Sequence, residues 1–255
     1  MKKIINAFPV IKYAVIIVRT FIITPSIATR LQRLISYFSD LMRYRRLQQN
    51  TTYSLNVTDL FPRIHDKTPN QYIDPIYFLQ GCWCARKIFE ARPAYHYDVA
   101  SQAIMVGIVS QFTPTTMIDI RPLSLSLPGL SFIRGDVTNL PFKDREIHSL
   151  SSICVIEHIG LGRYGDELDP FGTEKAAREL SRVLAPHGSL YISVPVDKEN
   201  KIYFNAHRAF TRDYIINLFQ DFSLIEERYI YGRDMCDAYD VTKGFGTGLY
   251  HFKKR

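Results

Sequence analysis

From residue 95 onward, short apolar runs alternate with stretches of helical period, and this alternation limits the chain to few folds. Buried strands are predicted at 95–100, 116–120, 131–133, 148–156 and 189–196. Helices are predicted at 103–112, 172–184 and 211–219, with closing strands at 222–231 and 248–254. Strands that alternate with helices indicate a parallel sheet covered on both faces. The sequence therefore predicts an α/β domain, doubly wound around a mostly parallel sheet, over residues 95–255.

The first 50 residues form a basic segment with a composition of its own. They carry nine Lys and Arg against one acid, whereas the other 205 residues carry 23 bases and 24 acids. Because the positive charge is confined to this segment, we expect no nucleic-acid partner. The apolar stretch 8–24 is interrupted by Lys12 and Arg19, short of the roughly 18–20 residues that a membrane span needs.

Residues 1–50 are therefore expected to be a helical arm, and two interpretations of it remain. It is an amphipathic helix lying on an anionic inner leaflet, or a helix packed on the body or on a second subunit. Residues 51–94 are predicted to be a linker and a leading helix at 76–91. The four cysteines lack a disulfide framework, and no metal-ligand spacing occurs. We expect a cytoplasmic protein, with the arm as its means of reaching the membrane, and no bound metal.

Gly160, Gly162 and Gly165 spell the dinucleotide-binding fingerprint G-x-G-x-x-G. That motif binds phosphate when it follows the first strand of the sheet, but here it follows the fourth predicted strand. Ligands of open α/β sheets bind beyond the carboxyl ends of the strands. The glycines are therefore predicted to be a mobile backbone segment beside a substrate and not a dinucleotide site.

Acidic and polar residues stand at the ends of successive predicted strands: Asp98, Asp119, Asp136 and the pair Glu157-His158. Asp119 ends the second strand, about 20 residues after Asp98, where a carboxylate accepts hydrogen bonds from a ribose diol. Each acid alone is more often a turn or cap residue. The four together predict a nucleoside cofactor at this edge.

The segments DVASQ, MIDIRPL, RGDVTNLPF, SSICVIEHIG and ELSRVLAPHGSLYISVPV resemble, in this order, the motifs of class I S-adenosylmethionine-dependent methyltransferases. The resemblance covers about residues 95–230. The longer string from SLSSICVIEHIG to FNAHRAFT resembles more specifically the bacterial "domain of unknown function 268" family, whose members are often associated with surface-polysaccharide genes. The resemblance implies a Rossmann-like fold, S-adenosylmethionine as the cofactor, and O-methylation of a sugar or glycan intermediate.

The resemblance also assigns roles to cofactor-binding residues. The loop around the methionine moiety would contain Asp98, Ala100, Ser101 and Gln102. Asp119 would hold the ribose, and Ile120, Asp136 and Val137 would surround the adenine. Glu157 and His158 would lie beside the transferred methyl group. One departure stands out, since Ala100 and Gln102 occupy positions where the family pattern has glycine, and Gln102 is large enough to fill part of the pocket.

Methyl transfer to a hydroxyl group needs positioning and a base. His158, His207 and Asp166 are the candidate bases. The residues Arg163, Tyr164, Asn205 and Arg208 supply donors suited to sugar hydroxyls or a phosphate. Two other functions remain open: a non-catalytic methyltransferase-fold subunit of a membrane-surface glycan assembly, and a nicotinamide oxidoreductase. The second is disfavoured because no phosphate glycines follow the first strand.

Overall fold

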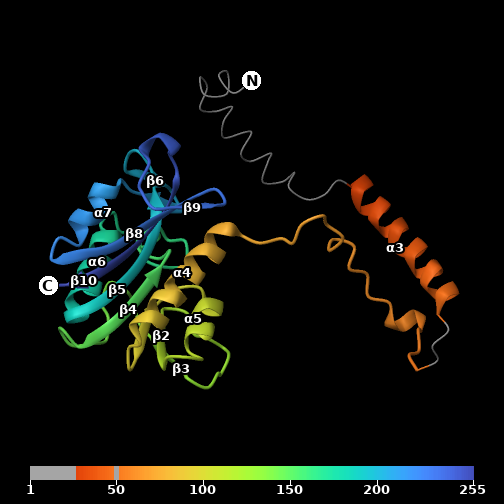
Figure 1. The fold of residues 1–255 in the computed structure, drawn as a ribbon, viewed down its shortest axis with the longest axis horizontal. Helices are drawn as coiled ribbons and strands as arrows, with labels where there is room; N and C mark the ends of the chain where they lie inside the picture. Colours follow the sequence, from red (N-terminus) through yellow and green to blue (C-terminus); the bar gives the residue numbers. More distant parts are fainter. Residues whose placement is uncertain (1–26, 49–51) are drawn as a thin grey trace. The chain divides into compact units, whose positions relative to one another are not determined.

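A computed structural model describes residues 27–48 and 52–255, and the chain divides into two units, Met1–Tyr72 and Ile73–Arg255 (Figure 1). The first unit contains helix α3 (Ile27–Leu47) and the short 3-10 helix η1 (Val57–Asp59). The apolar stretch 8–24 lies outside the described residues. Among the described residues, no helix has the length and apolar character needed to cross a membrane.

The second unit is built on one eight-stranded sheet with the order β3-β2-β1-β4-β5-β10-β8-β9 (Figure 1). Its strands are β1 (His96–Val99), β2 (Thr115–Asp119), β3 (Leu130–Arg134), β4 (Ile147–Ile153), β5 (Leu184–Val196), β8 (Phe222–Tyr231), β9 (Asp234–Cys236) and β10 (Gly246–Lys254). β1 to β5 pair in parallel, and β10 lies antiparallel between β5 and β8. The predicted doubly wound, mostly parallel sheet is confirmed, and its parallel strands bring their carboxyl ends to one edge.

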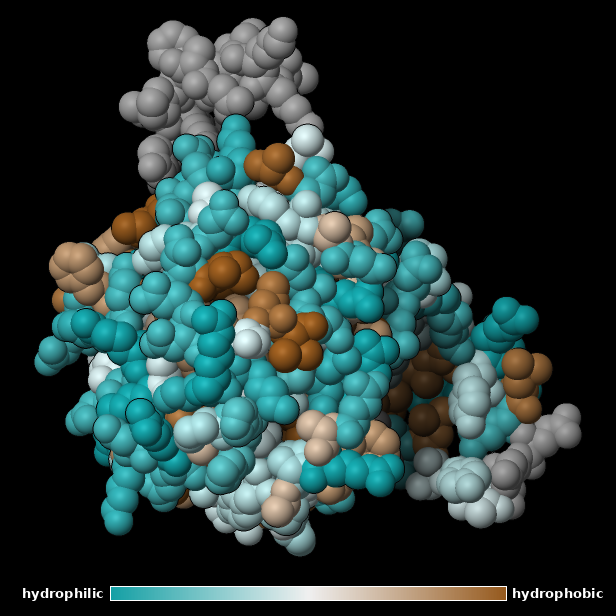
Figure 2. Space-filling model, turned by 60° about the vertical axis from the view of Figure 1, so that its left-hand side comes forward, coloured by the Kyte–Doolittle hydropathy of each residue, from teal (hydrophilic) through white to brown (hydrophobic). Residues whose placement is uncertain are grey.

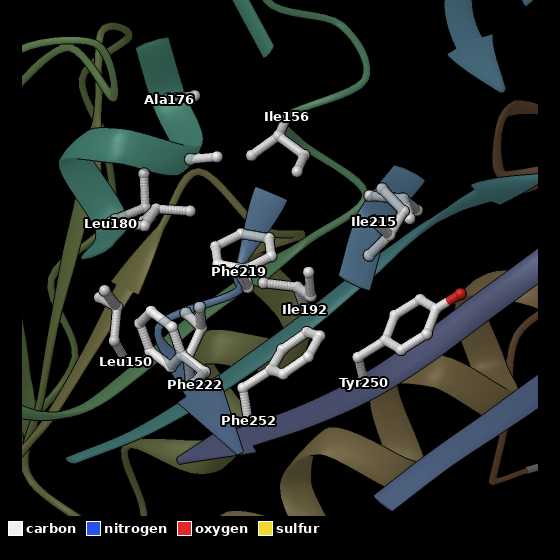
Figure 3. Packing of buried hydrophobic residues seen from close by; sticks show 14 of the residues in the cluster. Leu150, Ile156, Ala176, Leu180, Ile192, Ile215, Phe219, Phe222, Tyr250 and Phe252 are labelled. Carbon is white, nitrogen blue, oxygen red and sulfur yellow. The ribbon is translucent and has the colours of Figure 1, made fainter. Parts of the chain in front are cut away.

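Helices cover both faces of the sheet, as Figure 1 shows. Helices α4 (Pro75–Ala91) and α5 (Ala103–Val109) cover one face, and α6 (Gly172–Val183) and α7 (Arg212–Leu218) cover the other. Under α6 and α7 the rings of Phe219, Phe222 and Phe252 pack together beside Leu180 (Figure 3). On the surface, one face of the molecule is largely hydrophilic, with a small group of hydrophobic residues near its middle (Figure 2).

The leading helix α4 belongs to the sheet unit and not to a linker. Asp74 caps its first turn by accepting from the backbone of Ile76 and Tyr77, and Pro75 has the fixed φ that suits the first helical position. Trp83 and Ile88 are buried against the sheet. The helix is therefore one wall of the domain, and it contributes side chains near the ligand edge.

Some short elements were not predicted. The hairpin of β6 (Lys201–Tyr203) and β7 (His207–Ala209), and the strand β9, are each three residues per strand, too short for a periodic pattern to indicate them. The start of β5 was also predicted five residues too late. Leu184 already pairs with Ile147, and Pro186 lies where the pairing register shifts, so that it interrupts no ladder hydrogen bond.

Candidate functional site

A cavity of about 560 Å³ lies at the carboxyl ends of β1 to β4. It is lined by Val99 and Ala100 after β1, by 118–121 after β2, by 134–138 after β3, and by residues of the segment 154–169 after β4, with Lys175 of α6. Aliphatic walls with a few polar groups are typical of a small-molecule site. Asp119, Ile120, Asp136, Val137 and His158 line it, as do Ala100, Tyr164 and Asp166.

The turn after β1 is held by a buried chain of hydrogen bonds. Asp98, 1% exposed, accepts from the backbone N–H of Ser101 and from the hydroxyl of Ser151. That hydroxyl lies 2.9 Å from Nε2 of His96, which is also buried. Burial raises the pKa of Asp98 to about 6, against the opposing hydrogen bonds. Asp98 does not line the cavity. Its hydrogen bonds fix the conformation of the turn that does.

The departures from the family glycines have different consequences at the two positions. Ala100 lines the cavity and has a φ of +57°, which is the left-handed backbone conformation. Glycine adopts this conformation at a lower free-energy cost than alanine. Gln102 caps α5, and its side chain is exposed and does not line the cavity. The side chain of Gln102 therefore leaves the cavity free.

Asp119 ends β2 with its carboxylate at the cavity wall, 7% exposed. Its Oδ1 accepts from the backbone N–H of Arg121 at 2.8 Å, and the Arg121 guanidinium approaches both oxygens at 3.3–3.4 Å. The same guanidinium lies 4.5 Å from the ring centre of Tyr164. Arg121 therefore links Asp119, the residue predicted to bind a ribose, to the loop after β4. Arg121 was not singled out from the sequence.

Asp136, which follows β3, stabilises the turn in which it lies. Asp136 accepts from the backbone N–H and the hydroxyl of Thr138, both at 2.8 Å, which fixes the turn that follows the strand. Val137 is 5% exposed and contributes an apolar wall, and Ile120 contributes another.

Glu157 and His158 are both buried after β4. His158 Nδ1 lies 2.6 Å from the carbonyl oxygen of Ala206. Because a carbonyl only accepts, Nδ1 carries the proton, which leaves a lone pair on Nε2. Nε2 faces Glu157 Oε1 at 3.5 Å, and Glu157 Oε2 has no hydrogen-bond partner in the described chain.

Desolvation shifts the pKa values of this pair in opposite directions. It raises the pKa of Glu157 to about 8 and lowers the pKa of His158 to about 4. At neutral pH both groups are therefore uncharged. The pKa of His207 is also lowered, first by burial and then by the charge of Arg163.

The segment 160–166, here called the glycine loop, is folded around the carboxylate of Asp166. Oδ2 accepts from the backbone of Gly160 and Gly162, and Oδ1 accepts from the backbone of Tyr164. Burial alone would raise the pKa of Asp166, but these N–H groups outweigh it and hold the pKa below its usual value. All three glycines of the motif have positive φ. The motif therefore forms a tight loop beside the cavity, after the fourth strand and away from the turn after β1.

The remaining predicted residues lie outside the cavity lining. Arg208 is 6% exposed, and its guanidinium donates to the carbonyls of Ile159 and Asp169 and to the hydroxyl of Thr173, so it ties β7 to the segment after β4. Arg163 donates to the carbonyl of Ala206 and lies over Tyr164. Asn205 is exposed in the turn of the β6–β7 hairpin. His207 and Glu157 also do not line the cavity.

The order of this sheet, with β10 antiparallel between β5 and β8, is that of a class I methyltransferase-like Rossmann fold. Solved structures agree with it. The [4+2]-cyclase SpnF is 12% identical over 70% of this chain and 80% of its own, with a TM-score of 0.54. A putative sarcosine dimethylglycine methyltransferase from Galdieria sulphuraria (12%, 72% and 91%, TM-score 0.51) and the N-methyltransferase NodS from Bradyrhizobium japonicum WM9 (14%, 71% and 97%, TM-score 0.50) are similar too.

Residues 142–243 match the profile of a family described as "Caenorhabditis protein of unknown function, DUF268". The resemblance to DUF268 is thereby confirmed over the segment that contains the glycine loop and the β6–β7 hairpin. A comparison with curated proteins found no match. At identities of 12–14%, the structural similarities show the fold alone.

The glycine loop gives a direct prediction. A Cβ at Gly160 would lie 2.0 Å from the carbonyl oxygen of Asp169, whereas a Cβ at Gly165 would meet nothing within 4 Å. Both residues have a φ above +80°. We expect Gly165→Ala to lower the free energy of unfolding by about 1 kcal/mol, the cost of the left-handed backbone, and Gly160→Ala to lower it at least twice as far. Urea denaturation of both variants measures the difference, and equal losses would contradict the packing argument.

Proposed function

We propose that the chain is an S-adenosylmethionine-dependent methyltransferase. The observation that carries the proposal is the Asp119 carboxylate, which ends β2 at the wall of a cavity lined by both aliphatic and polar side chains. A carboxylate in this position accepts the two hydroxyl hydrogens of a ribose. The methyltransferases from Galdieria sulphuraria and Bradyrhizobium japonicum have the same fold, which supports this choice among nucleoside ligands.

The residues present fit such a cofactor. Asp119 would hold the ribose once the Arg121 guanidinium turns away, and this side chain is 56% exposed and free to do so. Ile120 and Val137 would enclose the adenine, with Asp136 at its edge. Ala100, in the turn held by Asp98, would face the methionine moiety, whereas Ser101 is buried and its hydroxyl accepts from the backbone N–H of Ile153. When bound, the cofactor supplies a methyl group on a positively charged sulfur.

The first prediction of this proposal concerns Asp119. Asp119→Asn removes the charge and one acceptor while it keeps the shape, so we expect the dissociation constant for S-adenosylhomocysteine to rise about tenfold or more, as hydrogen bonds to charged groups contribute roughly 1.5–3 kcal/mol. Isothermal titration calorimetry measures it. Asp213→Asn is the matched control, because that acid is 89% exposed on the surface.

The outcome also separates the rival functions. Binding of NAD without binding of S-adenosylhomocysteine would favour the oxidoreductase. Binding of neither would favour the non-catalytic subunit. The left-handed Ala100 and the ion pair of Arg121 with Asp119 are consistent with that alternative.

We further propose that His158 takes the proton of an acceptor hydroxyl on Nε2 as the oxygen receives the methyl group. The hydrogen bond from Nδ1 to Ala206 holds the ring, and Glu157 stands behind Nε2. At a pH above the Glu157 pKa of about 8, its carboxylate, 3.5 Å from Nε2, would stabilise the imidazolium that forms. His207 and Asp166 remain alternative bases, although the Asp166 carboxylate is occupied by three backbone N–H groups.

The raised pKa of Glu157 predicts a pH dependence with a definite sign. Between its ordinary value of 4.5 and about 8, the folded chain keeps a proton that the unfolded chain has lost, so this group lowers the free energy of unfolding as pH rises through that window. In Glu157→Gln we expect this decline to disappear. Chemical denaturation at pH 5 and pH 8.5 compares the two proteins.

A nitrogen NMR titration tests the coupling of Glu157 to the imidazole. In the wild type, the Nε2 resonance of His158 should shift with a midpoint near pH 8, and in Glu157→Gln it should not. A shift that persists in the variant would mean that another group titrates there.

The acceptor that we propose is a sugar or glycan intermediate of surface-polysaccharide synthesis, as the DUF268 resemblance implies. Tyr164 of the glycine loop lines the cavity, Arg163 lies over the Tyr164 ring, and Asn205 is exposed on the neighbouring hairpin. These groups offer the hydrogen-bond donors that hydroxyls and phosphates require.

We also propose that the arm lies on an anionic membrane surface. Helix α3 exposes an apolar face that includes Leu31, Ile35 and Phe38, which are 58%, 64% and 49% exposed. Basic side chains lie to either side of this face and in its last turn, and α3 carries five Arg against one acid. An apolar face bordered by bases is typical of a helix in the plane of an anionic leaflet.

Vesicle flotation tests the arm. Full-length protein should float with phosphatidylglycerol-rich vesicles, and Phe38→Glu should weaken this binding strongly. Ser36→Glu adds the same charge on the opposite side of α3, so it should have a smaller effect. Equal effects of the two substitutions, or no flotation, would favour packing of the arm on protein.

A further inference from the structure

Three ring side chains gather on the surface next to His158. Tyr203 and His207 come from the β6–β7 hairpin, and Phe245 directly precedes β10. Their ring centres lie 5.0 Å (Tyr203–His207), 5.6 Å (His207–Phe245) and 6.2 Å (Tyr203–Phe245) apart. Tyr203 and Phe245 are 41% and 49% exposed. These three residues, here called the aromatic shelf, present ring surface to solvent although they contact one another.

The aromatic shelf continues from the cavity. His158 lines the cavity, and its ring centre lies 6.4 Å from that of His207. On its other side, the ring of His158 lies 5.6 Å from Tyr164 of the glycine loop. The imidazole therefore separates the proposed cofactor cavity from the aromatic shelf, which is the position that a base between cofactor and acceptor must take.

Polar groups surround the aromatic shelf. Asp197 follows the end of β5, where a Cβ on Gly244, the residue before Phe245, would lie 4.0 Å from its Oδ1. Lys201, at the base of the hairpin, places Nζ 3.4 Å from Asp197 Oδ2. Asn205 occupies the hairpin turn and is exposed. Asp197 is 7% exposed and its Oδ1 accepts from the backbone N–H of Lys198, so it positions Lys201. The Lys201 ammonium and the Asn205 amide are thus the polar groups beside the half-exposed rings.

We propose that the aromatic shelf binds the acceptor and that the acceptor group is a pyranose ring. A pyranose has an apolar C–H face and an edge of hydroxyls. The rings of Tyr203 and Phe245 would pack against the face, and Lys201 and Asn205 would bond the edge. A planar aryl acceptor has no ring of hydroxyls to match these two groups. This inference rests on the proposed methyltransferase function, and it adds a binding site and a ligand class that the cavity does not specify.

The test uses the full-length protein and three alanine variants. Saturation-transfer difference NMR measures contact with UDP-glucose, UDP-galactose and GDP-mannose, and with 4-nitrocatechol as the aryl probe. Calorimetry measures S-adenosylhomocysteine binding by the same proteins. We expect saturation of the hexose ring protons of at least one nucleotide sugar, and a tenfold or greater loss of its affinity in Tyr203→Ala and in Phe245→Ala. Phe204→Ala is the matched control, since Phe204 lies on the same hairpin, is 72% exposed and makes no ring contact within residues 52–255.

The two measurements separate the two proposals. If S-adenosylhomocysteine binds all variants equally while only the shelf variants lose the sugar, both proposals stand. If the wild-type protein binds the sugar but not S-adenosylhomocysteine, the methyltransferase function is overturned and the sugar site still stands. No saturation of any hexose ring, saturation of the catechol alone, or equal effects of Phe204→Ala and Phe245→Ala would overturn the aromatic shelf as a sugar site.

Discussion

The buried carboxyl of Asp98 is the interaction on which the ligand edge depends. A carboxyl group this deep in a sheet destabilises the fold unless it is hydrogen-bonded or protonated. Here the hydroxyl of Ser151 on β4 and the N–H of Ser101 supply the bonds, and His96 completes the chain on the other side of Ser151. The chain ties β1 to β4 in the centre of the sheet and closes the turn that contains Ala100. The first wall of the cavity is thus positioned by a residue that does not line it.

Two of the six non-glycine residues with positive φ in the described chain lie at the same edge. Ala100 after β1 and Cys154 after β4 both have positive φ and both line the cavity. A side chain in this conformation costs roughly 1 kcal/mol or more, and such residues cluster where a structure fixes a ligand wall. Each is held from the side: Ala100 by its bond to Ile118, and Cys154 by its bonds to Ser193 and Gln80. The strain is compatible with a rigid site that is formed before a ligand arrives.

The sequence predicted the sheet well because alternating strand and helix periods carry the order of a parallel fold. The strand-end position of Asp119 followed from the same pattern. The contacts between side chains at the site were not predicted. No periodicity indicates that Arg121 reaches over Asp119 to Tyr164, or that the Asp166 carboxylate is used by its own loop. Arg208, which bonds the segment after β4, and Ala206, whose carbonyl bonds His158, both lie on the β6–β7 hairpin, and strands of three residues have no periodic pattern.

The protonation of His158 limits the chemistry that this site can support. Its pKa of about 4 means that the imidazole is a weak base at rest, so it cannot remove a proton from a free hydroxyl before the reaction begins. Proton transfer becomes favourable only as the acceptor oxygen forms its new bond and its own acidity rises, which is the behaviour of a general base in the transition state. At neutral pH Glu157, with a pKa of about 8, is protonated and adds no charge that would stabilise the imidazolium. A pair that is uncharged at rest spares the interior the burial of a charge. Under the proposed function, a base of this kind favours acceptors that lose a proton during transfer, such as a sugar hydroxyl, over acceptors that are already anionic.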